Sequence, residues 1–237
     1  MTIERKVGMG IAGQPSGATD VADVFSTYLY TGNNSTQTIT NGIDLAGEGG
    51  MVWIKSRNNA ARHPYIHDTE RGIDNVLQPN STNAEADFSF LNLAVASNGF
   101  SMNVAEPAYN SSGNDYASWT FRKKEKFFDV VTVTTGNSTN TRHSHNLGSV
   151  PGLIIGKNLN GTGQWYSYHR SLGRNKHVRL NGANAASTST DIWGTSDPTD
   201  TDFGVNDSGS GFGNMGDMVY YLFADNSSED AEDQMIK

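Results

Sequence analysis

The sequence predicts an all-β protein of two tandem, pseudo-symmetric antiparallel β-sandwich modules that follow an N-terminal arm. Short runs of β-branched and aromatic residues are separated by turns every 8–12 residues or so, as in sandwiches. This pattern occurs twice along the chain. Gly, Asn, Ser and Thr supply about two fifths of the 237 residues, and they disfavour long helices but suit tight turns.

The duplication extends over about 95 residues per copy. Segment 25–68 aligns with 129–170 after a two-residue deletion, and segment 115–121 falls on 217–223 without a further net gap. The matched residues include Thr31-Gly32-Asn33 with Thr135-Gly136-Asn137, Gly50 with Gly152, Lys55 with Lys157, Asn58 with Asn160, and His67 with His169. Internal similarity at a fixed spacing indicates a repeated structural unit.

The repeat divides the chain into module 1 (residues 22–124) and module 2 (residues 127–226). Residues 1–21 are Gly-rich and lie outside the repeat, so we interpret them as an arm or linker. Residues 227–237 begin acidic and end on Gln234-Met-Ile-Lys237, a new apolar start. We expect this end to lead toward a further module of a longer natural chain.

Each module is predicted as a series of short strands. They are 26–30, 51–55, 100–104 and 116–121 in module 1, and 130–134, 153–157, 165–169, 203–205 and 218–223 in module 2. The expected core residues are Trp53, Ile54, Trp119 and Phe121 in module 1, and Ile154, Ile155, Trp165, Tyr221 and Phe223 in module 2. Only segments 83–87 and 184–186 suggest single helical turns.

Charge and composition exclude several classes of protein. The net charge is −8, and the single basic cluster, residues 122–126, is interpreted as a solvated linker, so no nucleic-acid partner is expected. The absence of Cys removes disulfides, thiolate metal sites and thiol nucleophiles. The sequence has no run of eighteen apolar residues, so no membrane insertion is expected. Residues 1–20 lack the apolar region of a secretory signal.

Histidine and aspartate groupings are the candidates for metal binding. His63 and His67 have a chelating i, i+4 spacing, but Pro64 disfavours the helix that it needs. His143 and His145 share one face of a strand. Aspartates also crowd one loop-rich stretch, at positions 191, 197, 200, 202 and 207, without the spacing of a Ca²⁺ loop. Turn formation and ordinary strand histidines explain these groupings better, so no metal and no cofactor is predicted.

Catalysis also lacks a convincing motif. His67 with Asp68 and Glu70 is the best acid–base candidate, but module 2 has Arg170 at the position matched to Asp68. A structural hydrogen bond from the imidazole is the preferred interpretation. The G-x-G-x-x-G of residues 211–216 precedes a strand rather than a helix, so it predicts a turn and no dinucleotide site. We therefore expect a protein that is not an enzyme.

Several motifs together resemble duplicated β-modules of about 100 residues in virion proteins of tailed phages, especially phages of marine bacteria. The resemblance covers about residues 22–226. Module 1 contributes Gly-Glu-Gly-Gly-Met-Val-Trp-Ile-Lys-Ser-Arg (47–57) and Trp-Thr-Phe-Arg-Lys (119–123), and module 2 contributes Trp-Tyr-Ser-Tyr-His (165–169) and Ile-Trp-Gly-Thr-Ser-Asp-Pro-Thr (192–199). In that family these motifs are structural.

The resemblance implies a virion protein at the tail or particle surface, most simply a tail fibre or other receptor-facing adhesin, in contact with other virion proteins. It also implies a homotrimer. A purely structural capsid or tail decoration is the alternative, and a polysaccharide depolymerase is a distant third. Because polar loops carry binding sites on rigid scaffolds, we predict contact with a host-surface glycan through loops 107–114 and 207–215. The nominated residues are Tyr109, Asn110, Asp207 and Phe212.

Overall fold

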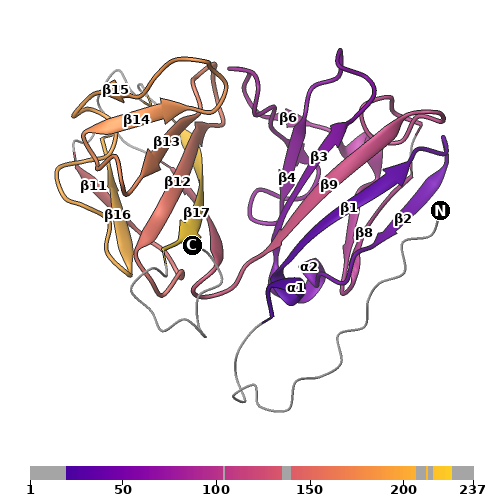
Figure 1. Cartoon of the computed structure of the whole chain (residues 1–237), viewed down its shortest axis with the longest axis horizontal. Helices are drawn as coiled ribbons and strands as arrows, with labels where there is room; N and C mark the ends of the chain where they lie inside the picture. The colour runs from indigo at the N-terminus through magenta and orange to yellow at the C-terminus, as the bar shows by residue number, and fades with distance from the viewer. Residues whose placement is uncertain (1–19, 104, 135–139, 207–211, 213–215, 226–237) are drawn as a thin grey trace.

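The fold is all-β, as predicted, and consists of antiparallel sheets arranged in two modules (Figure 1). The computed structural model describes residues 20–103, 105–134, 140–206, 212 and 216–225. The predicted arm and the C-terminal segment lie almost wholly outside the described residues. Within the described residues, no helix has the length and apolar character to cross a membrane.

Module 1 is built from nine short strands and three single helical turns. The elements are α1 (Val21–Val24), β1 (Phe25–Thr31), β2 (Thr36–Thr40), α2 (Leu45–Glu48), β3 (Gly50–Ser56), β4 (Tyr65–Asp68), β5 (Asn75–Val76), β6 (Ala86–Asp87), a 3-10 helix (Ser89–Leu91), β7 (Ala94–Ala96), β8 (Gly99–Asn103) and β9 (Asp115–Arg122). A sheet in the order β1-β9-β3-β4 faces a smaller sheet in the order β2-β8-β7.

Module 2 repeats this plan. Its elements are β10 (Phe128–Thr134), β11 (Thr141–Ser144), β12 (Pro151–Asn158), β13 (Tyr166–His169), β14 (Lys176–Arg179), β15 (Ser187–Thr188), β16 (Asp202–Val205) and β17 (Asp217–Ala224). The large sheet runs β10-β17-β12-β13-β14-β15, and β11-β16 forms the small one. Each strand predicted from the sequence is present, with its ends moved by at most two residues.

The helical turns do not lie where the sequence analysis placed them. Residues 83–87 contain β6, and 184–186 are irregular. The turn α2 instead forms at residues 45–48, where Asp44 caps it by accepting a hydrogen bond from the Gly47 amide at 2.8 Å. A carboxylate at the N-cap satisfies an amide that has no partner within the helix.

Strand registers show which residues of the two modules are equivalent. Thr31 pairs with Asp115, and Thr134 pairs with Asp217. The two hydroxyls make the same side-chain bond to their aspartates, at 2.9 Å and 2.6 Å. Thr134, and not Thr135, is therefore the counterpart of Thr31. The alignment made from the sequence is wrong by one residue at this turn.

The histidine match is also wrong by one residue. Met51 and Leu153 are equivalent, because they pair with Phe121 and Phe223 on the closing strands. Their partners on the other side are Asp68 for Met51 and His169 for Leu153. His169 thus corresponds to Asp68, because the β12–β13 connection is one residue shorter than that between β3 and β4. The histidine does not recur.

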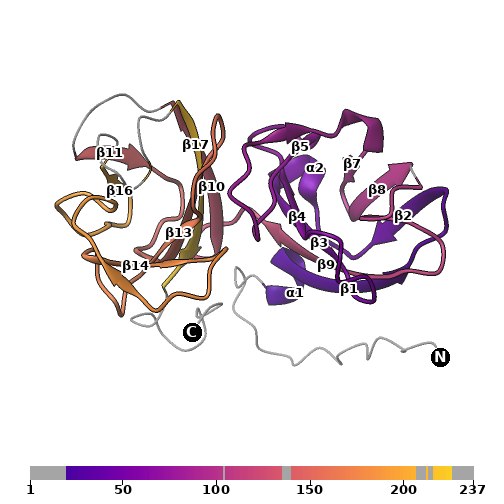
Figure 2. The same cartoon turned by 90° about the horizontal axis from the view of Figure 1, so that it is seen from above.

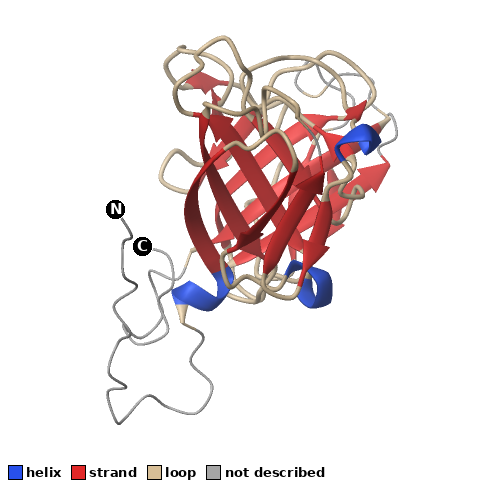
Figure 3. Ribbon diagram, turned by 90° about the vertical axis from the view of Figure 1, so that its right-hand side faces the viewer, coloured by secondary structure: helices blue, strands red, loops and turns tan. Residues whose placement is uncertain are grey.

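Three apolar cores hold the molecule together, one in each module and a third between them. Strand β3 supplies the first and third cores from alternate residues: Val52 and Ile54 face the interior of module 1, whereas Met51 and Trp53 face module 2. Along β17, Val219 and Tyr221 face module 1. The two large sheets therefore pack through their outer faces, and Figure 2 shows the two modules side by side. Figure 3, which looks along the line that joins the modules, shows that they are built almost wholly of strands and loops.

This arrangement corrects the predicted core. Ile54 and Ile154 lie in the cores of their own modules. The other predicted residues, apart from Trp119, belong to the core between the modules: Trp53, Phe121, Ile155, Trp165, Tyr221 and Phe223. Trp119 is only partly buried and belongs to none of the three clusters.

Candidate functional site

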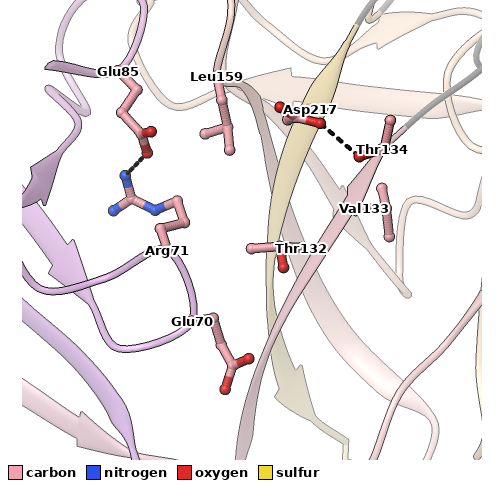
Figure 4. Close-up of a pocket in the computed structure, with 8 residues that line it drawn as sticks. All are labelled: Glu70, Arg71, Glu85, Thr132, Val133, Thr134, Leu159 and Asp217. Carbon is pink, nitrogen blue, oxygen red and sulfur yellow. Dashed lines mark hydrogen bonds and ion pairs between the residues drawn. The ribbon is translucent and has the colours of Figure 1, made fainter.

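A polar groove of about 260 Å³ lies at the boundary between the modules (Figure 4). Module 1 contributes Glu70, Arg71 and Glu85, and module 2 contributes residues of β10, Leu159 and Asp217. The groove is the candidate functional site because Glu70, one of the carboxylates considered for acid–base chemistry, lines it together with Arg71, the partner of Asp68.

The centre of this region is a buried ionic network that joins the modules. The Arg71 guanidinium donates to Asp68 Oδ2 and to Glu85 Oε2, each at 2.6 Å. Tyr221 of module 2 donates its hydroxyl to Asp68 Oδ2 at 2.7 Å. The side chains of Asp68 and Arg71 are 0% and 1% exposed. Because breaking a buried pair leaves an uncompensated charge, this network ties the two modules in one relative position.

Hydrogen bonds to backbone carbonyls reinforce the same boundary. The indole N–H of Trp165 donates to the carbonyls of Gln78 and Ser81, at 3.0 and 3.1 Å. The Glu85 amide donates to the Leu159 carbonyl at 2.9 Å. The loop between β5 and β6 in module 1 is thereby held against the segment before β13 in module 2.

His67 has a structural role on the opposite side of its strand. Its Nδ1 lies 2.8 Å from the Ile73 carbonyl oxygen, and its Nε2 lies 2.8 Å from the Tyr109 hydroxyl. Burial lowers the pKa of His67 to about 4, so the ring is neutral at neutral pH. Successive residues of a strand point to opposite faces, which is why His67 faces the module 1 core while Asp68 faces module 2.

His67, Asp68 and Glu70, the acid–base alternative to a structural role for the histidine, are therefore not assembled as one group. Asp68 is bound to Arg71 and Tyr221, and Glu70 forms an ion pair with Lys123 at 2.6 Å. Both ring nitrogens of His67 have partners within module 1. Each member makes a separate structural contact, so the three side chains have no common face toward a substrate.

The groupings that were weighed as metal ligands, and set aside in favour of ordinary roles, make separate contacts. His63 Nδ1 lies 3.0 Å from Asn80 Oδ1, away from buried His67. His143 and His145 both lie against the ring of Phe203. Among the aspartates, Asp202 binds Arg142, whereas Asp207 lies outside the described residues. Among the residues that the structure describes, no three His, Asp or Glu side chains are arranged to hold a metal ion.

Three of the four residues nominated for receptor contact are buried, which contradicts their nomination. Tyr109 is fully buried and stacks on Tyr65 with ring centroids 5.1 Å apart. Asn110 is also fully buried, and its Oδ1 accepts from the Asn33 amide at 2.9 Å. Phe212 is 2% exposed and packs in the module 2 core. These three side chains are not surface contacts. Asp207 and most of loop 207–215 lie outside the described residues.

The sequence analysis missed the contact between the modules, although the sequence carries a signal for it. Segments Met51–Ile54 and Tyr220–Phe223 are apolar at every position. A strand with one solvated face alternates apolar and polar residues, whereas a strand buried on both faces is continuously apolar. Asp68 and Arg71, by contrast, give no sign in the sequence that their partner is Tyr221, 150 residues away or more.

Comparison with known proteins gives one match. A search of curated proteins and a search of solved structures each find no significant match. The profile of one family matches residues 20–228 as a single unit, and this range includes both modules and the boundary between them. The chain belongs to the family described as Domain of unknown function (DUF7483).

Proposed function

We propose that this chain is a non-catalytic structural protein of a tailed-phage virion, most simply part of a tail fibre or another receptor-facing adhesin. The proposal combines the resemblance of the sequence motifs with the rigid two-module body. It places the chain at the tail or particle surface, in contact with other virion proteins and as a homotrimer.

The observation that carries the proposal is the use of polar side chains at the module boundary. Arg71, Asp68 and Tyr221 bind one another, and His67 is held by two partners inside module 1. Residues that would be candidates for chemistry thus serve to fix the fold. A scaffold whose two halves keep one relative position suits a protein that must transmit force or display loops.

A purely structural capsid or tail decoration is the second candidate, because the same rigid body serves it equally well. Electron microscopy of purified particles with gold-labelled antibody against the chain separates the two. Label on fibres supports the adhesin, label over the capsid supports the decoration, and particles without the chain by mass spectrometry contradict both.

Function at the host surface has its own test. Purified chain added to host cells is expected to slow adsorption of the phage that encodes it, whereas the same amount of heat-unfolded chain leaves adsorption unchanged. Clearing of the host polysaccharide by purified chain would instead support the depolymerase and contradict the non-catalytic proposal.

A further inference from the structure

The contact between the modules uses only half of the outer face of each large sheet. Six side chains, each at most 2% exposed, lie at the centre of this contact: Met51, Ile66 and Leu77 from module 1, and Val130, Val219 and Tyr221 from module 2. Module 1 thus uses the half of its face on the β3–β4 side. Module 2 uses the half on β10 and β17, the strands that correspond to β1 and β9.

Module 1 leaves open the half that module 2 uses. Trp119 is the counterpart of Tyr221, because each lies two residues before the matched phenylalanine of its closing strand. Its neighbour Thr27 is the counterpart of Val130. Trp119 is only partly buried, Thr27 is exposed, and Leu29, the next residue on this face of β1, is 55% exposed. We call Thr27, Leu29 and Trp119 the β1 face.

Module 2 leaves open the other half. Leu153 corresponds to Met51, as the registers show. Val178 of β14 pairs with Ser167 and corresponds to Leu77. Leu153 and Val178 are only partly buried and belong to none of the three apolar cores. We call these two residues the β14 face.

The contact inside the chain is therefore heterologous, since it joins two different halves of one repeated surface. Each chain keeps one unused half of each kind, the β1 face on module 1 and the β14 face on module 2. Heterologous contacts extend from copy to copy and form a ring if the rotation closes, or a filament if it does not. The pairing seen between the modules can thus be repeated between the β1 face of one copy and the β14 face of the next.

Strand β1 has the character of a surface that is covered in the assembled protein. It ends the large sheet of module 1 (Figure 1), and sheet edges that face solvent are usually protected by Lys, by other charged residues or by Pro. Residues 25–31 include none of these. Beside β1, the rings of Trp53 and Trp119 meet edge to face, with centroids 6.2 Å apart. Trp is enriched at the centres of protein interfaces.

The two open faces lack the ionic network of the contact inside the chain. The positions of Asp68 and Arg71 are occupied in module 2 by His169 and Leu172, and the position of the Tyr221 hydroxyl donor by an indole. Aromatic and apolar packing would hold two copies together without burying an ion pair. We therefore expect this contact to be weaker than the one inside the chain and to dissociate on dilution.

We propose that copies of this chain assemble head to tail, with the β1 face of one copy packed on the β14 face of the next. The inference deepens the proposed homotrimer, because it names the surfaces through which the copies meet. Only the number of three copies rests on the proposed function.

The test is the mass of the full chain in solution, measured by light scattering and native mass spectrometry over a dilution series. We expect trimers that dissociate on dilution. Leu29→Lys and Val178→Lys each place a charge in one face and should weaken association about tenfold or more. Phe90→Lys is the matched control, because Phe90 is 53% exposed but lies on the 3-10 helix instead of an outer sheet face, and it should leave association unchanged.

A mixture of the two face variants tests the head-to-tail geometry. Each variant keeps one intact face, so an equimolar mixture should form dimers with one copy of each variant and no larger species. A contact of the β1 face with itself would be broken by Leu29→Lys and not restored by mixing, and would overturn the proposal. Circular dichroism checks that each variant folds. Val178→Thr, which nearly keeps the shape of the side chain, replaces Val178→Lys if the lysine prevents folding.

The remaining outcomes separate this inference from the proposed function. A wild-type chain that stays monomeric at high concentration overturns the inference, whereas labelling of particles tests the virion assignment independently. A trimer that neither lysine variant weakens leaves the homotrimer standing and removes these surfaces. An assembly of another size that both variants break confirms the surfaces and contradicts the homotrimer.

Discussion

Tyr221→Phe removes one hydroxyl from the boundary between the modules and leaves the aromatic ring in place. The lost bond is short, 2.7 Å, and ends on a carboxylate that is fully buried. Asp68 keeps Arg71 at 2.6 Å, so its charge remains compensated. Hydrogen bonds to charged groups contribute about 1.5–3 kcal/mol. Because one partner of the carboxylate survives, we expect the free energy of unfolding to fall by about 2 kcal/mol.

The matched control is Tyr30→Phe, which removes a hydroxyl from inside module 1. Tyr30 donates to the neutral Tyr109 carbonyl at 2.8 Å, and such a bond contributes about 1 kcal/mol. Both variants lose the same atom from a buried ring, so the difference between them measures the charged acceptor at the module boundary.

Urea unfolding followed by tryptophan fluorescence measures the effect, because Trp53 and Trp165 belong to the core between the modules. We expect one cooperative transition for the wild type, with a midpoint lower in Tyr221→Phe than in Tyr30→Phe. A loss below about 0.5 kcal/mol in Tyr221→Phe would refute the claim that this bond ties the modules together.

Three further perturbations test other parts of the fold. Trp165→Phe should lower the unfolding free energy by about 2–4 kcal/mol in urea. It removes the indole donor from the Ser81 carbonyl and one of two donors from the Gln78 carbonyl, which keeps the Ser81 amide, and it shrinks a buried ring. Unchanged stability would contradict the contact with module 1. Gly99→Ala should prevent stable folding, as measured by circular dichroism, because a Cβ there would meet the Ile39 carbonyl oxygen in a backbone with φ +146°. The control Gly113→Ala, at φ +82° with open space around it, should lower the unfolding free energy by only about 1 kcal/mol. Equal effects of the two substitutions would count against this reasoning. Acid should destabilise the protein as the pH falls from 6.5 toward 4, because the pKa of His67 is about 4 in the folded state and 6.5 in the unfolded state, so the unfolded state binds more protons. We expect the unfolding free energy to fall by about 2 kcal/mol between pH 7.5 and 5 in the wild type, and this loss to be absent in His67→Gln. A flat pH profile in the wild type would contradict the buried imidazole.

The packing of the two modules also gives a physical reason for the family boundary. The matched range of 20–228 spans both copies, and the third core takes residues from both. Separating the modules would expose large apolar side chains such as Trp165 and Tyr221, whose burial stabilises the chain by about 2–3 kcal/mol each. We therefore expect the pair, rather than the single module, to be the unit that folds.

Local patterns were enough to predict the strands and the duplication. The alternation and turn residues of segments such as 26–30 and 130–134 act over a few neighbours, and the composition disfavours helices throughout. The predicted strands are accordingly present, and the fold class is confirmed. Helical turns were placed wrongly, because α2 depends on one capping contact from Asp44 rather than on a period.

Only the tertiary structure decided what each face of those strands meets. The sequence shows that Val52 and Trp53 are apolar, but not that one faces a module core and the other a second module. It places His67 beside Asp68, whereas the pleat of the strand sends them to different cores. The sequence places Tyr109 in a polar loop, whereas in the structure its hydroxyl forms a buried hydrogen bond with His67. These outcomes depend on contacts between residues far apart in the chain, and such contacts leave no local pattern.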